Sequence, residues 1–334
     1  MPIPYSVLDL APVLEGFPVA QSFRNMVDLA QRTEAWGYHR YWLAEHHAHA
    51  GVASAATVVL IEHVLSKTKT IRVGSGGIML PNHSPLIVAE QFGTLETLHP
   101  GRVDLGLGRA PGTDQRTAAA LRRNMAATHD SFPHDVVALL EYFGPPPEGA
   151  GEGFYVRAFP GEGLHVPLYI LGSSLYGAEL AALLGLPFAF ASHFAPEYLS
   201  QALSVYRSKY TPSAANPKPH AMATLNVIAA DTRGQARYLF TSLQQHFLNI
   251  GRGRPTALER PTDDITKFAS PADLAHLHAK LGGTIVGDRN DVGAGLRAFL
   301  DRTQADELIF TALIHDHEAR CHSFEIAAKE ARAV

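Results

Sequence analysis

The sequence predicts an α/β protein with a (β/α)8 (TIM) barrel that carries insertions after its fourth and seventh strands. Short apolar runs alternate with helix-period segments along all 334 residues, which is typical of β-α units repeated around a parallel sheet. Counting gives eight strands, each followed by a helix, over a length typical of one barrel. A doubly wound nucleotide fold would need a glycine fingerprint in its first β-α turn. Residues 10–20 contain a single glycine, Gly16, so this fingerprint is missing.

The eight expected strands are short apolar runs bounded by polar or glycine residues. They lie at residues 5–11, 38–44, 71–80, 103–107, 168–171, 188–192, 224–229 and 307–312.

The helices follow from apolar stripes at helical spacing and from their start and stop residues. Ser22 is the expected N-cap of the first helix, and Ser84 precedes a helix with Pro85 at its first position. Gly37 and Gly185 are expected stops. The other helices are expected at 54–66, 115–143, 175–184, 197–210, 232–247, 271–281, 291–303 and from 316. The irregular segments 144–167 and 248–270 are the two insertions, and residues 1–334 form a single domain.

Composition excludes several classes of protein. With 46% hydrophobic and 18% charged residues, the chain can bury enough apolar surface to fold, which excludes intrinsic disorder. A net charge of -4 provides no positive field for nucleic acid or anionic lipid. Cys321 is the only cysteine, so there is no intramolecular disulfide and no thiolate zinc cluster. We find no signal peptide and no membrane-length apolar run, and we expect a cytoplasmic protein.

The active site of such a barrel lies at the carboxyl ends of its strands. The second strand ends in Glu45-His46-His47-Ala48-His49. These histidines could be ordinary loop residues, but a glutamate beside a histidine can also raise the imidazole pKa toward neutrality. The third strand contains Gly74, Gly76 and Gly77, which indicate either a barrel-corner kink or a place where a flat ring approaches the main chain.

A phosphate site is expected where the fourth and fifth strands end. Arg109 could grip a phosphate with two parallel hydrogen bonds, or it could form a surface ion pair. Ser173 and Ser174 precede a helix, where hydroxyl residues are ordinary caps but where free N–H groups also bind anions. Arg109 and Ser174 would converge on one phosphate.

The sequence resembles the bacterial luciferase-like flavin-dependent monooxygenases over essentially the whole chain, and in particular the single-polypeptide alkanal-monooxygenase-like branch. The segments that carry the resemblance are WLAEHH (42–47), GSGGIMLPNHSP (74–85), AEQF (89–92), LHPGR (98–102), LGLGRAPG (105–112), LGSS (171–174) and FASHF (190–194).

The resemblance implies a barrel that takes reduced FMN, made by a separate NAD(P)H:flavin reductase, and reacts it with O2. It implies that His46 and Glu45, the residue before it, are catalytic, and that Gly76 and Gly77 form a non-prolyl cis peptide under the flavin ring. Arg109 and the residues Ser173, Ser174 and Gly177 would hold the phosphate, although luciferase has a glutamate at the position of Ser173 and a threonine at that of Gly177.

The implied reaction passes through a flavin hydroperoxide, which survives only where water and stray protons are excluded. His46 is the candidate for proton management, because its unperturbed pKa lies near neutrality. The segment 248–270 would form a mobile cover over the site. Arg252 and Arg254 could close on that site or simply face solvent.

Three rival functions are weighed. A metal-dependent barrel hydrolase is suggested by His47-x-His49 and His315-x-His317, but it would need histidines and an aspartate where the later strands end in Arg109 and the serines. No metal ligand set is therefore predicted. A barrel that uses the deazaflavin F420 for hydride transfer and a non-enzymatic flavin-binding protein are the other two rivals.

The resemblance also implies a homodimer through the helices near the second and third strands. Their candidate contact residues could instead pack on the barrel, which is the commoner role of an apolar stripe. These residues are Val58, Ile61, Leu65, Phe92 and Leu95.

Overall fold

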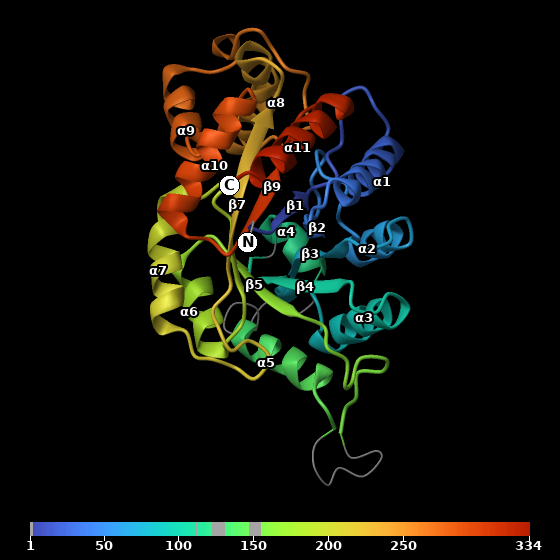
Figure 1. Cartoon of the computed structure of the whole chain (residues 1–334). Helices are drawn as coiled ribbons and strands as arrows, with labels where there is room; N and C mark the ends of the chain where they lie inside the picture. The colour runs from blue at the N-terminus through green and yellow to red at the C-terminus, as the bar shows by residue number, and fades with distance from the viewer. Residues whose placement is uncertain (1–2, 111, 122–130, 147–154) are drawn as a thin grey trace.

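The structure is a computed structural model and describes residues 3–110, 112–121, 131–146 and 155–334. Within these residues, eight parallel strands close into a barrel in which β1 pairs with both β2 and β9 and β6 pairs with β7. Figure 1 shows the strands at the centre with helices around them. The barrel strands are β1 (Tyr5–Asp9), β2 (Arg40–Leu43), β3 (Arg72–Met79), β4 (Val103–Gly108), β5 (Leu168–Gly172), β6 (Phe188–Phe190), β7 (Ala221–Ala229) and β9 (Glu307–Thr311). The expected fold class is confirmed.

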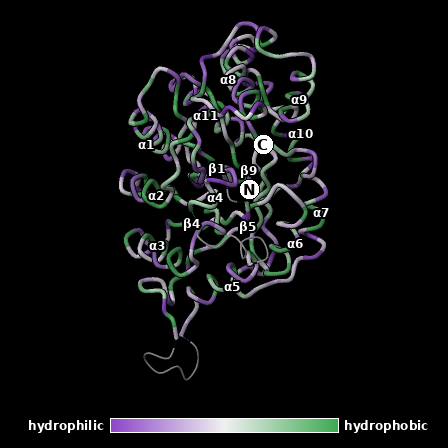
Figure 2. The backbone as a smooth tube through the Cα atoms, turned by 180° about the vertical axis from the view of Figure 1, so that it is seen from behind, coloured by the Kyte–Doolittle hydropathy of each residue, from purple (hydrophilic) through white to green (hydrophobic). Residues whose placement is uncertain are grey.

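The helices surround the barrel, and hydrophilic and hydrophobic stretches alternate along them in Figure 2. Their apolar faces meet the outer faces of the strands in one large buried cluster. The α-helices are α1 (Val19–Ala35), α2 (Thr57–Leu65), α3 (Pro85–Leu98), α4 (Gln115–Leu121), α5 (Phe132–Phe143), α6 (Leu175–Leu184), α7 (Leu199–Lys209), α8 (Arg233–Gly251), α9 (Pro271–Leu281), α10 (Arg289–Thr303) and α11 (His317–Ala331).

Some helix boundaries differ from the expectation. Pro18, not Ser22, is the N-cap of α1, and Ser22 lies buried inside the helix. A proline with extended backbone can begin a helix one turn before the first hydroxyl residue. Ser84 does precede α3, and Gly185 ends α6 with a φ of +62°. The expected helix 115–143 is present as α4 and α5, and residues 122–130 between them lie outside the described residues.

Four of the five expected dimer contacts are buried against the barrel and cannot meet a partner. Ile61, Leu65, Phe92 and Leu95 are all at most 3% exposed, and Val58 packs against the same core. The apolar face that these residues form therefore packs on the barrel, which was the alternative prediction. A homodimer stays a prediction, but this face does not provide its surface.

The insertion after the seventh strand is larger than 248–270. It contains α8, α9 and an unexpected short strand, β8 (Ile285–Gly287), which pairs with the last residues of β7. Figure 1 shows α8 and α9 together at one end of the molecule. The segment expected to be a mobile cover is anchored to the loop after β1, because Leu258 donates to the Val13 carbonyl (2.7 Å) and accepts from the Glu15 amide (2.9 Å).

Arg252 and Arg254 are both exposed, which agrees with the alternative that they face solvent. Arg252 pairs with Asp273 on α9 at 2.7 Å.

In the insertion after the fourth strand, residues 147–154 lie outside the described residues. The remainder of that insertion packs on α3, where a Cβ on Gly93 would lie 2.2 Å from the carbonyl oxygen of Pro160.

A buried ionic network fills the amino-terminal end of the barrel. Arg40 Nε lies 2.8 Å from Glu307 Oε1, and its Nη1 lies 2.9 Å from Asp104 Oδ2 and 2.7 Å from the Tyr169 hydroxyl. Arg72 contacts the other oxygen of Asp104 at 2.6 Å. Two cations thus face two carboxylates that are 0% exposed. Because each buried charge is paired with an opposite charge, the cost of removing it from water is offset. The network lies at the end of the barrel opposite the expected active site.

The network makes stability depend on pH. Burial would raise the pKa of Glu307, but the charge of Arg40 and hydrogen bonds from His220, Arg40 and Ser6 lower it to about 2, from an ordinary value of 4.5. A carboxylate with a lowered folded-state pKa stabilises the protein above pH 4.5, and this stabilisation is lost as the pH falls toward 2.

We therefore expect the free energy of unfolding, measured by urea titration, to fall across that interval. Glu307→Gln should start from a lower stability at pH 7 and show a shallower fall. Glu179→Gln is the matched control, because Glu179 forms an exposed pair with Lys209. An unchanged pH slope in Glu307→Gln would contradict the assignment.

Candidate functional site

The loop after β2 brings a glutamate and several histidines to the carboxyl end of the barrel. Glu45 Oε1 lies 2.7 Å from Nε2 of His47 and 2.8 Å from Nε2 of His83, and Oε2 accepts from the Met79 amide at 3.1 Å. Burial would raise the pKa of Glu45, but these contacts hold it below its ordinary value. Glu45 is therefore an ionised carboxylate inside the protein.

His46 is held separately from Glu45. Its Nδ1 lies 3.2 Å from the carbonyl oxygen of Gly112. Because a carbonyl only accepts, Nδ1 carries the proton, and Nε2 of the neutral ring is free to accept one. Burial lowers the pKa of His46, and Gly112 and Glu45 raise it by less. Glu45 raises the pKa of His46 as expected, but burial outweighs this effect, so the net pKa lies below its ordinary value.

Three further histidines lie near His46. The rings of His46 and His49 are 6.3 Å apart, and those of His49 and His246 are 5.8 Å apart. Burial lowers the pKa of His193, after β6, to about 3 and that of His246, on α8, to about 4. Nδ1 of His193 is buried and has no hydrogen-bond partner among the described residues. The barrel mouth is thus lined by neutral imidazoles.

Sequence reasoning did not assign His83, His193 or His246 to the site. The strand-end rule could have found His83 and His193, since they follow β3 and β6. Nothing in the sequence marks His246, which α8 carries to the mouth from the insertion.

The glycines of β3 are required by close packing. The peptide between Gly76 and Gly77 is cis. A Cβ on Gly74 would lie 2.2 Å from the Asp104 carbonyl oxygen, and one on Gly77 would lie 2.7 Å from that of Gly106. Gly76 is half-buried, whereas Gly74 and Gly77 are buried. Packing of β3 against β4 therefore explains Gly74 and Gly77. Gly76 is the least buried of the three, and a Cβ there would meet the side chains of Leu8 and Trp42.

The side chain of Arg109, which follows β4, contacts the first turn of α6. The Arg109 guanidinium lies 4.0 Å from the ring centroid of Tyr176, in the first turn of α6. Ser174 is the N-cap of this helix, and its side chain forms no capping hydrogen bond within the described residues. Ser173 is half-buried and Ser174 is exposed. The Arg109 cation thus lies beside the first turn of α6, whose N-cap is Ser174.

Gly177 packs inside the same turn. A Cβ there would lie 3.3 Å from both the Gly172 Cα and the Phe188 ring. Its small size brings α6 close to the end of β5. A larger residue at this position would require the Phe188 ring or the Gly172 main chain to shift.

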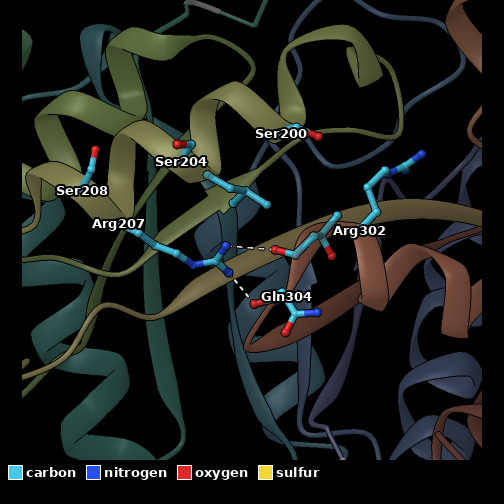
Figure 3. A pocket seen from close by; sticks show the side chains of 8 residues that line it. Ser200, Ser204, Arg207, Ser208, Arg302 and Gln304 are labelled. Carbon is cyan, nitrogen blue, oxygen red and sulfur yellow. Dashed lines mark hydrogen bonds between the residues drawn. The ribbon is translucent and has the colours of Figure 1, made fainter.

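A hollow of about 540 Å³ lies elsewhere, on the outside of the barrel between α7 and the turn after α10. Figure 3 shows Arg207 reaching across it to the main chain of Thr303 and Gln304. Because this guanidinium already binds two carbonyl groups, the hollow is a helix-packing feature. It is not adjacent to the strand-end residues.

The histidine pairs that suggested a hydrolase do not converge. His47 contacts Glu45, whereas His49 Nδ1 accepts from the Gly51 amide at 3.1 Å. His315 contacts the Glu15 carbonyl and His317 contacts Asp28. Neither pair directs both rings at one point.

Comparisons with known proteins show the family of the chain. The family profile described as luciferase-like monooxygenase matches residues 5–307. A luciferase-like monooxygenase of Escherichia coli K12 is 52% identical over 325 residues, which cover 97% of this chain and 96% of that protein. The oxygenase component of the flavin-dependent trigonelline monooxygenase of Acinetobacter baylyi is 28% identical over 115 residues, covering 31% of this chain and 32% of that protein.

Solved structures share the fold. Apo-MsnO8 has a TM-score of 0.90 and 32% identity, with 98% of each chain covered. The oxygenating constituent of 3,6-diketocamphane monooxygenase from Pseudomonas putida, in complex with FMN, has a TM-score of 0.73 and 19% identity, covering 100% of this chain and 99% of that one. An F420-dependent secondary alcohol dehydrogenase has a TM-score of 0.72 and 15% identity, covering 99% and 100%.

No helix in the described parts of the chain is both long and apolar enough to cross a membrane. With most of its length matched by the family profile and half of its residues shared with the E. coli protein, the chain belongs to the luciferase-like monooxygenase family.

Proposed function

We propose that this protein is the oxygenase component of a two-component flavin monooxygenase. It would take reduced FMN from a separate NAD(P)H:flavin reductase and use O2 to oxidise a small organic substrate such as an aldehyde. The observation that carries the proposal is the meeting of Arg109 with the N-terminus of α6. The FMN complex of the diketocamphane enzyme and the oxygenase component from A. baylyi support a flavin and a partner reductase.

The phosphate end of FMN fits the residues present. A phosphate dianion is attracted to a guanidinium, and the free N–H groups of a helix N-terminus add further donors. Ser173 and Ser174 supply hydroxyl groups beside them, and the stacking of Arg109 on Tyr176 holds the guanidinium in place. These residues are therefore the proposed phosphate site, with Gly177 providing main chain only.

The residues around Gly76 also fit the flat flavin ring of FMN. The half-buried main chain of Gly76 has no room for a Cβ, which would lie 2.7 Å from Leu8 Cδ1 and 3.0 Å from Trp42 Cβ. An apolar cluster lines the barrel interior below it, and Leu10 and Leu171 extend this cluster toward the mouth. We propose that the flat ring lies on the Gly76–Gly77 main chain, where apolar walls exclude water.

Bound reduced FMN would supply the two electrons with which O2 is activated. The chain's own task is to manage protons. His46 presents a neutral Nε2, which can take up one proton and, because burial lowers its pKa, releases it again readily. His49, His193 and His246 add no charge near neutral pH. The mouth therefore holds few acidic protons that could drive peroxide release.

The cofactor is tested by anaerobic titration of the purified protein with photoreduced FMN and, separately, with reduced F420. We expect reduced FMN to bind, and its oxidation after O2 is admitted to differ from that of free reduced FMN. Binding of reduced F420 alone, with no effect on flavin oxidation by O2, would favour the hydride-transfer alternative.

The role of His46 is tested by His46→Ala. With reduced FMN, O2 and an aldehyde substrate present, we expect more of the consumed oxygen to be released as hydrogen peroxide and substrate oxidation to fall by about 100-fold or more. His276→Ala, on the exposed surface of α9, is the matched control. Unchanged turnover and peroxide release in His46→Ala would show that the assignment is wrong.

A further inference from the structure

One buried carboxylate joins two loops of the barrel mouth. Glu45 is 1% exposed and accepts from His47, which lies in the loop after β2, and from Met79 and His83 at the end of β3 and beyond it. The distances to the two imidazoles, 2.7 and 2.8 Å, are typical of strong hydrogen bonds to a charged acceptor. These contacts connect the loop that carries His46 to the strand that carries the cis peptide.

Glu45 does not act on His46 directly. Its described hydrogen bonds go to His47, His83 and Met79, and His46 is held by the carbonyl of Gly112. A carboxylate that already accepts from three donors is poorly suited to exchange protons with a substrate. Its position is nevertheless critical, because a displacement of about 1 Å in a reacting group can cost about 100-fold in rate.

We propose that Glu45, His47 and His83 form a positioning clamp that fixes the loop carrying His46 to the end of β3, with His83 as a previously unassigned positioning residue. This rests on the proposed function, since the clamp matters only if His46 works on a bound flavin. It also changes the expected role of Glu45 from a catalytic to a positioning residue.

The same three side chains offer metal-ligating atoms that all lie within 4.8 Å of one another. The two imidazole N–H groups account for the short contacts to Glu45 without any cation. A clamp of hydrogen bonds therefore predicts that full activity needs no metal at this position.

The clamp is tested with His83→Leu and His83→Gln, since a glutamine amide can donate where Nε2 does. The first measurement is the titration of His46, followed by NMR of nitrogen-15-labelled histidine without flavin. Loosening of the loop in His83→Leu should admit water and move the pKa of His46 up toward its ordinary value of 6.5. His83→Gln should keep the wild-type titration.

The second measurement is the rate at which hydrogen peroxide is released after O2 is admitted to the protein mixed with reduced FMN. This rate should rise in His83→Leu and return to the wild-type value in His83→Gln. His99→Leu is the matched control. His99 also contacts a carboxylate, that of Glu62 at 2.9 Å, but this pair lies far from the mouth. The clamp is overturned if folded His83→Leu leaves the His46 titration unchanged, or if elemental analysis finds a stoichiometric metal whose removal shifts that titration. Failure of the wild-type protein to bind reduced FMN would overturn the proposed function alone, because the NMR comparison needs no flavin.

Discussion

Replacing Arg40 with methionine is expected to lower the free energy of unfolding by about 3–5 kcal/mol. Arg40 is 6% exposed and contacts both Glu307 and Asp104, which are fully buried. Methionine fills similar space but leaves Glu307 without its cation and Asp104 with Arg72 alone. The loss should be measured by urea unfolding at pH 7, where Glu307 is ionised.

Arg233→Met is the matched control for this change. Arg233 pairs with Asp291 at 2.6 Å, but the arginine is 60% exposed. Exposed ion pairs contribute about 0–1 kcal/mol, so this variant should unfold close to the wild type. Equal losses in the two variants would show that the buried network has no special role in stability.

Replacing Arg109 with alanine is expected to weaken the binding of reduced FMN by about 10- to 100-fold. A hydrogen bond to a charged group contributes about 1.5–3 kcal/mol, and the guanidinium beside α6 is placed to provide such bonds. Reduced riboflavin lacks the phosphate, so its affinity should change little. Anaerobic titrations of both flavins, followed by absorbance, measure this difference.

Arg302→Ala is the control, because Arg302 also lies over an aromatic ring, that of Phe299, but on the outer surface. It should leave both flavins unaffected. If Arg109→Ala weakened the binding of reduced riboflavin and reduced FMN equally, the arginine would act on the ring or on folding and not on the phosphate.

The barrel could be predicted because its signals are local. Each barrel strand is a short apolar run, and parallel strands place their carboxyl ends at one rim. The position of Arg109 beside the first turn of α6 follows from that rule, since β4 and β5 are neighbours. The cis peptide at Gly76 and Gly77 was implied by family resemblance, and the structure contains it.

Other features depend on tertiary contacts that no local pattern contains. β8 is three residues long and exists because β7 extends past its pairing with β9. The sequence neighbour of His46 is Glu45, yet the carboxylate turns to His83, which lies 38 residues away. The lowered pKa of His46 likewise comes from burial, which the spacing of residues 45–49 does not reveal.

A crystal structure of the protein with FMN tests the central claim most directly. We expect the phosphate to lie between Arg109 and the first turn of α6, and the ring to lie on the main chain of Gly76 and Gly77 with His46 at its edge. A phosphate bound away from Arg109, or a ring outside the barrel mouth, would contradict the proposed site.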